Sequence, residues 1–238
     1  MALLDLVRDS PGVRSGLSIA AAVGLYGISF GALSVTTGLS VLQTCVLSLV
    51  MFTGGSQFAF IGVLGGGGAP AAALGAASLL GLRNGVYAMQ LNALLKPPAV
   101  HRPLLAHVTI DESVATGLAQ SSLQERRRGT WTAGVGIFVL WNVFTLVGAL
   151  VGDQLGDPRQ WGLDGAAVAA FLALLWPRLR AAEPIATAVA CALVTVLTIP
   201  VLPPGTPILA AAVVAALIAW VWHRVRAGRD PLLARETR

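Results

Sequence analysis

Long runs of apolar residues, separated by short polar or proline-containing stretches, dominate the sequence. No Asp, Glu, Lys, Arg or His occurs between Arg14 and Arg83, and further charge-free stretches cover residues 129–152 and 184–222. A run of about 20 mostly apolar residues is long enough to cross a bilayer as a helix. The pattern therefore predicts membrane-spanning helices over about 16–33, 39–64, 71–95, 130–151, 163–176, 185–202 and 208–222.

The runs are continuous and rich in Ala, Leu and Gly, and they lack the alternation of apolar and polar residues that a membrane barrel requires. We therefore expect an all-α integral membrane protein with a polytopic bundle of about seven or eight helical segments. Some segments should be broken by glycine, with Gly54 and Gly55 as the first candidates. The four glycines of residues 65–68, followed by Pro70, predict a tight connection between two spans.

The composition agrees with this class, because only 11% of the residues are charged, against about 25% in a typical soluble domain. We expect one transmembrane domain over residues 1–238, with a short N-terminal tail, 1–14, and a basic C-terminal tail, 224–238. The net charge of +5 does not indicate nucleic-acid binding, since the basic residues lie between apolar runs instead of forming one face.

Neither a metal nor another cofactor is expected. Cys45 and Cys191 each lie inside an apolar run, where a small buried hydrophobic residue is the expected role. No Cys or His cluster has the spacing of a metal site. The chain also has no Gly-x-Ser-x-Gly elbow, no His-Glu-x-x-His and no phosphate-binding glycine loop, so we expect no catalytic residues and no enzyme activity.

Basic residues tend to remain on the cytoplasmic side of a membrane, and they predict how the later spans are oriented. They place the loops around 96–102, 126–128 and 178–180, and the C-terminus, in the cytoplasm of a multi-pass plasma-membrane protein. Three complete spans before Lys96 would leave Arg8 and Arg14 outside. If these two arginines are inside, either 104–122 crosses the membrane or an earlier segment is re-entrant, and both alternatives remain open.

A faint internal repeat relates two places where one apolar run ends and the next begins. Residues 31–33 (Gly-Ala-Leu) and 38–40 (Gly-Leu-Ser) resemble residues 148–150 (Gly-Ala-Leu) and 162–164 (Gly-Leu-Asp). An odd number of spans between the copies would make this repeat inverted, as in many secondary transporters. Pairs of glycines four residues apart predict close helix packing or, alternatively, local unwinding around a substrate; they are Gly12/Gly16, Gly27/Gly31, Gly81/Gly85 and Gly148/Gly152.

Arg83 lies at the centre of a predicted span, 12 residues from both Ala71 and Leu95. A charge at this depth costs about 2.5–3.5 kcal/mol on insertion scales, so it should face protein, water or a counter-ion. A guanidinium can hold a carboxylate in bidentate fashion, which favours a substrate carboxylate or a coupling acidic residue as the partner. The alternative is an ion pair with Asp111 or Glu112 that only holds helices together.

Asp111 and Glu112 fall within 104–122, the least hydrophobic candidate segment. Burial disfavours the charged form of a carboxyl group, so either residue could load and release a proton. Alternatively, this segment is an amphipathic surface helix with a solvated acidic face. His107 would share a helical face with Asp111, four residues later, if the helix were continuous.

Two further groups of polar residues are candidates for substrate binding. Gln57 follows Thr53-Gly54-Gly55-Ser56, where two glycines in an apolar setting favour an unwound turn whose backbone can meet a polar ligand. Asn84 and Tyr87 lie beside Arg83 on roughly one face of the 71–95 span. Hydrogen bonding between helices is the alternative role for all three side chains.

The order of these residues resembles the AzlC family, the large subunits of two-component branched-chain amino acid exporters. The similarity runs from about Arg14 to Pro177. It is carried by Phe30-Gly31, by residues 53–59 (Thr-Gly-Gly-Ser-Gln-Phe-Ala), by Leu82-Arg83 with Tyr87, by Ile110-Asp111-Glu112, by Trp141, by Gly156-Asp157-Pro158 and by Gly162-Leu163-Asp164.

The resemblance implies proton-coupled export of Val, Leu, Ile or Met together with a small four-helix membrane subunit of the AzlD type. Gln57, Arg83, Asp111 and Glu112 match the polar signature of the family. Ser29 replaces a usual proline, and Gly81 and Asn84 replace the Asn and His that usually flank the arginine. The missing histidine leaves Asp111 or Glu112 as the proton carrier.

The predicted substrate-binding residues are accordingly Gly54, Gly55, Gln57, Arg83, Asn84 and Tyr87. A non-transporting membrane scaffold, and a channel or exporter for another small solute, are the alternative functions.

Overall fold

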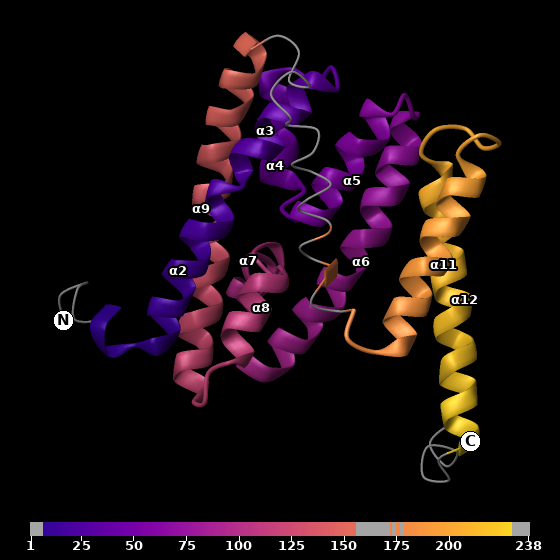
Figure 1. Ribbon diagram of the computed structural model, residues 1–238. Helices are drawn as coiled ribbons and strands as arrows, with labels where there is room; N and C mark the ends of the chain where they lie inside the picture. The colour runs from indigo at the N-terminus through magenta and orange to yellow at the C-terminus, as the bar shows by residue number, and fades with distance from the viewer. Residues whose placement is uncertain (1–6, 156–171, 173–174, 177–178, 230–238) are drawn as a thin grey trace.

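The computed structural model describes residues 7–155, 172, 175–176 and 179–229, and the regular elements within them are all helices (Figure 1). The predicted all-α class is therefore confirmed for this part of the chain. Three of the described helices are long and apolar enough to cross a membrane: Pro11–Thr36, Leu123–Gln154 and Thr206–Val225. The predicted span over 163–176 lies almost entirely outside the described residues.

Helices α2 (Pro11–Leu25) and α3 (Gly27–Thr36) follow one another with a single-residue break at Tyr26, and α9 (Leu123–Leu155) lies beside both. A methyl group placed on Gly12 would meet the backbone of Glu125, and one placed on Gly24 would meet Leu140. The contacts advance along both elements together, so α2–α3 and α9 run parallel. The glycines at 12, 16, 27, 31, 148 and 152 all serve this close packing, which is the first of their two predicted roles.

A re-entrant hairpin follows, formed by α4 (Val41–Val50) and α5 (Gly54–Gly65). Gly65 at the end of α5 lies against Thr37 at the end of α3, so the chain enters and leaves the hairpin at the same end of the molecule. Each leg of 10 or 12 residues extends only about 15–18 Å, roughly half of a bilayer core. The prediction that 39–64 crosses as one span is therefore wrong, and the break lies at 51–53, just before the predicted glycines.

Helix α6 (Pro70–Leu95) then runs the length of the molecule and ends beside the start of α9. The two helix ends are joined by Arg127 of α9, which donates two hydrogen bonds to the carbonyl oxygen of Leu95, at 3.0 and 2.7 Å. Its 26 residues are long enough to cross a bilayer. They include the polar groups of Arg83, Asn84 and Asn92, which explains why α6 is less apolar than the three helices named above.

A second hairpin follows α6, formed by η1 (Ala99–His101), α7 (Arg102–His107) and α8 (Asp111–Leu118). Gly117, near its end, lies against Thr130 and Arg126 in the first turns of α9, so this hairpin enters from the opposite end to the first. Segment 104–122 is therefore neither a complete crossing nor a surface helix, and Ser113, Val114 and Thr116 of α8 are buried.

The two hairpins show whether the N-terminal arginines lie on the same side of the bundle as the basic residues after α6, which the sequence leaves open. With 39–64 re-entrant, the start of α2, the end of α6 and the start of α9 all lie at one end of the molecule (Figure 1). Arg14, Lys96 and the arginines at 126–128 thus share one side of the bundle. Figure 1 shows the end of α12 at this same end.

The hairpin tips meet beside Phe138, near the middle of α9. The ring of Phe138 lies 5.0 Å from Phe52 of the first tip and 5.4 Å from His107 of the second. Each hairpin is followed by one long helix, and the two units, 41–95 and 99–155, enter from opposite ends. The two units therefore run in opposite directions along the bundle. The predicted repeat of the two Gly-Ala-Leu copies stays a prediction, because part of the second copy, 162–164, lies outside the described residues.

Helices α11 (Ala182–Thr198) and α12 (Thr206–Arg229) pack against each other beside α6 (Figure 1). Ile208 at the start of α12 contacts a small cluster formed by Val63, Ala73 and Ala76. No residue of α11 is buried, and Leu193, Leu197 and Leu217 of this pair are more than half exposed. The pair therefore presents a wide apolar surface.

Candidate functional site

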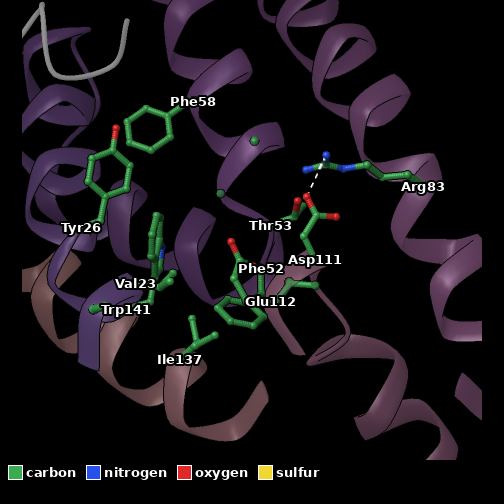
Figure 2. Close-up of a pocket in the computed structure, with 14 residues that line it drawn as sticks. Val23, Tyr26, Phe52, Thr53, Phe58, Arg83, Asp111, Glu112, Ile137 and Trp141 are labelled. Atoms are coloured by element: carbon green, nitrogen blue, oxygen red, sulfur yellow. Dashed lines mark ion pairs between the residues drawn. The ribbon is translucent and has the colours of Figure 1, made fainter. Parts of the chain in front are cut away.

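A cavity of about 360 Å³ lies where both hairpin tips approach α2, α6 and α9 (Figure 2). The first tip contributes residues from its turn and from the start of α5, and the second contributes the start of α8. The cavity is lined by Ala22, Val23, Tyr26, Phe52, Thr53, Gly54, Gly55, Phe58, Arg83, Ile110, Asp111, Glu112, Ile137 and Trp141.

One wall of the cavity is aromatic. The Tyr26 ring centroid lies 5.2 Å from that of Phe58 and 6.1 Å from that of Trp141. The break between α2 and α3 is what brings Tyr26 to this wall, while Trp141 is presented by the middle of α9. Figure 2 shows these three rings on the side of the cavity opposite to Arg83 and Asp111. The wall offers a rigid apolar surface against which an apolar group can pack.

The opposite wall holds an ion pair. A guanidinium nitrogen of Arg83 lies 2.9 Å from a carboxylate oxygen of Asp111, and the two side chains are 31% and 18% exposed (Figure 2). The pair explains how a charge is tolerated at the centre of α6. Because both partners also line the cavity, the ion pair and a role in ligand binding are compatible.

The first turn of α5 faces the same wall. Its N-cap residue, Thr53, makes no capping hydrogen bond with its side chain. A methyl group placed on Gly55 would lie 3.1 Å from a guanidinium nitrogen of Arg83, so the absence of a side chain lets the guanidinium approach the helix start. Free N–H groups at a helix start and a guanidinium both favour an anion, whereas Asp111 and Glu112 next to them favour a cation. The wall can thus hold both ends of a zwitterion.

Gln57 does not line this cavity. Its side chain is fully buried and holds the first tip together, donating hydrogen bonds to the carbonyl oxygens of Met51, at 2.8 Å, and Ser48, at 3.3 Å. Its amide oxygen accepts a hydrogen bond of 2.9 Å from the indole nitrogen of Trp141. In this structure Gln57 therefore has the alternative role, hydrogen bonding between helices. Its side chain positions both the first tip and Trp141 of the aromatic wall.

Replacing Gln57 with Leu should loosen the first tip. The indole N–H of Trp141 would lose its buried partner, at about 1–3 kcal/mol for an unsatisfied group, while the carbonyl oxygen of Met51 would keep the N–H of Thr53 as its donor. We expect a lower midpoint of thermal unfolding for the purified protein, measured in detergent. Gln43→Leu is the matched control, since Gln43 bonds to Ser40 in an exposed capping box and should change the midpoint far less. Equal midpoints for the two variants would contradict the role assigned to Gln57.

Asn84 and Tyr87 also lie outside the residues that line the cavity. Tyr87 packs against the cluster of Leu91, Leu95 and Leu105 near the end of α6. Among the predicted site residues, the structure brings together Gly54, Gly55, Arg83, Asp111 and Glu112. A continuous helix would place His107 and Asp111 on one face. The helix is not continuous, because residues 108–110 separate α7 from α8, so the two side chains do not share a helical face.

Two aromatic residues of the cavity are not revealed by the sequence. Tyr26 and Phe52 stand in apolar runs without a distinguishing pattern, and only tertiary packing brings them together with Phe58. Trp141 carries a weak signal, as a tryptophan at the centre of a long apolar run. Within the described residues, no group of three or more His, Cys, Asp or Glu side chains could hold a metal ion.

The family model described as AzlC protein matches residues 18–155. Every residue that lines the cavity falls within this range. Neither the curated proteins nor the solved structures contain a match.

Proposed function

The chain belongs to the AzlC family, and from this membership we propose that it is a permease subunit that exports branched-chain or similar apolar amino acids. The family makes it a membrane transporter-type subunit. The identity of the substrate rests on one observation, a cavity that combines an aromatic wall with an Arg83–Asp111 wall midway along the bundle. Val, Leu, Ile and Met are the expected substrates.

An apolar amino acid is complementary to both walls. Its carboxylate would bind the guanidinium of Arg83 and the free N–H groups at the start of α5. Its ammonium group would bind Glu112 or Asp111, and its side chain would pack on Tyr26 and Trp141. A cavity of about 360 Å³ lies at the small end of the range for small-molecule sites, about 300–1,000 Å³, which suits one amino acid.

Proton coupling would use the same charges. The ammonium group of the substrate and a proton compete for the Asp111 carboxylate. Protonation of Asp111 from outside as the substrate leaves, and release of that proton inside as the next substrate binds, would couple the entry of one proton to the export of one amino acid. Glu112, beside Asp111 on the cavity wall, is the second candidate for the proton carrier.

The outer face of α11 and α12 is a candidate surface for a partner, which we propose to be a small four-helix membrane subunit of the AzlD type. The side chains of this pair are mostly exposed and apolar, so lipid or a second apolar subunit must cover them. We further propose that the protein resides in the plasma membrane with the start of α2 and the end of α12 in the cytoplasm. The basic residues gathered at that end support this orientation.

Transport by reconstituted protein tests this function. Vesicles that contain the chain and its proposed partner are loaded with labelled valine or leucine, and efflux is followed with and without a pH gradient. We expect efflux that depends on the gradient and is inhibited by Ile and Met but not by Lys or Glu. Efflux without such selectivity would indicate a different solute, and no efflux of any tested amino acid would favour a membrane scaffold.

A further inference from the structure

A second cavity, of about 570 Å³, lies at the end of the bundle where α6 ends and α9 begins. It shares no residue with the first cavity and lies outside the proposed transport site. Its lining contains three residues that can carry positive charge and no Asp or Glu; the lining residues are Leu95, Lys96, Pro97, Pro98, His101, Leu104, Arg127, Trp131 and Val135.

The backbone at this corner holds the basic residues in place. Lys96 adopts a left-handed conformation, with φ of 46°, and ends α6 directly before Pro97 and Pro98. Arg127 reaches across from α9 and donates to the carbonyl oxygen of Leu95 from two nitrogens, Nε and Nη2. The guanidinium is therefore fixed, and its remaining nitrogen can serve another acceptor.

Within the described part of the chain, the positive charges at this corner have no carboxylate counter-ion. Among the described residues, neither Lys96 nor Arg127 has a carboxylate within 4.0 Å, and the nearby Glu125 already pairs with Arg128 at 2.7 Å. Uncompensated cations around a cavity attract a polyanionic or phosphate-bearing group, which Arg binds through its fork and Lys as a point charge.

The other lining residues are those of a membrane boundary. Trp131 lies one turn after the arginines at 126–128, where the apolar stretch of α9 begins, and its ring is 6.4 Å from that of His101. Leu104 and Val135 line the same cavity and are 51% and 40% exposed. Tryptophan is enriched at the level of lipid headgroups, and exposed leucine and valine beside it suit acyl chains. A soluble anion would gain nothing from this apolar side.

We propose that this cavity binds the headgroup of an anionic phospholipid. Its phosphate contacts Lys96 and Arg127, its glycerol backbone lies beside Trp131, and its acyl chains lie along Leu104 and Val135. The bound lipid neutralises the corner and links α6 to α9 at the base of the second hairpin. Basic pockets between membrane helices are known sites for acidic lipid headgroups, so this chemistry has general precedent.

The experiment uses protein purified in a neutral detergent and titrated with phosphatidylglycerol or with phosphatidylcholine that has the same acyl chains. Retained lipid is counted by native mass spectrometry, and the midpoint of thermal unfolding is recorded at each lipid concentration. We expect one phosphatidylglycerol to remain bound and to raise the midpoint, whereas phosphatidylcholine does neither. Equal retention and equal stabilisation by the two lipids would overturn the proposal.

Two variants locate the site. Lys96→Asn removes a charge with a residue that tolerates the left-handed backbone, and Arg127→Gln removes the fixed guanidinium. Each should weaken phosphatidylglycerol binding by roughly fivefold. Arg126→Gln is the matched control, because Arg126 lies at the same end of α9, bonds to Gln120 and does not line the cavity.

Two outcomes would refute the assignment. Loss of binding in the control that equals the loss in both variants would indicate a diffuse surface attraction and not this cavity. Glycerol phosphate, a soluble anion with the phosphate of the lipid but no acyl chains, is titrated in the same way. If it stabilised the protein as fully as the lipid at equal concentration, the site would be one for a free anion.

Discussion

Replacing Arg83 with glutamine is expected to reduce amino acid efflux by at least tenfold, the loss that follows from removing one charge-assisted carboxylate contact of about 1.5–3 kcal/mol. The variant removes the group proposed to bind the substrate carboxylate and also leaves Asp111 without the cation that lies 2.9 Å away. Initial efflux of labelled leucine from vesicles provides the measurement. Arg14→Gln, which removes an exposed charge from α2, is the control and should retain efflux.

A double variant distinguishes a role of Arg83 in substrate binding from a role only as the counter-ion of Asp111. If Arg83 serves only to neutralise Asp111, the combination Arg83→Gln with Asp111→Asn should restore leucine counterflow, an exchange that needs no proton carrier, because both charges are then absent. If Arg83 binds the substrate, the double variant should remain as inactive as Arg83→Gln alone. Arg83→Lys should be intermediate, since lysine keeps the charge but lacks the planar fork. Restoration in the double variant would therefore reject the substrate-binding role while leaving export itself intact.

Gly31→Ala is expected to cause a large loss of stability. The added methyl group would overlap the backbone carbonyl oxygen of Thr145 on α9, which cannot move aside as a side chain would. Helices α3 and α9 must then separate, at about 3 kcal/mol, the upper end of the usual cost of overpacking. We expect the midpoint of thermal unfolding to fall by roughly 6–12 °C.

Gly85→Ala is the matched control for this substitution. Gly85 lies inside α6, and a methyl group placed on it would meet nothing within 4 Å. Alanine should therefore leave packing unchanged and favour the helix by about 1 kcal/mol. A Gly31→Ala protein as stable as the Gly85→Ala protein would show that α3 and α9 do not approach as closely as their backbones indicate.

The charged part of the candidate site could be predicted from the sequence because a charge in hydrocarbon is costly. Arg83 and Asp111 are conspicuous in a chain with few charges, and the structure pairs them. Gln57 is an instructive difference. Its place after two glycines suggests substrate contact, yet its amide satisfies the turn at Met51 and the indole of Trp141. A sequence does not record which buried polar groups a side chain will reach.

Helical class and membrane location followed from the sequence alone, because apolar runs of this length must satisfy their backbone hydrogen bonds internally in a bilayer. Whether each apolar run crosses the bilayer or turns back within it was decided only by the tertiary structure. Residues 39–64 are apolar enough to cross, but Gly65 packs against Thr37, so the chain turns back and forms a hairpin. Hydropathy is a property of single residues, whereas a reversal, the meeting of two tips and the aromatic wall between them depend on contacts between residues far apart in the sequence.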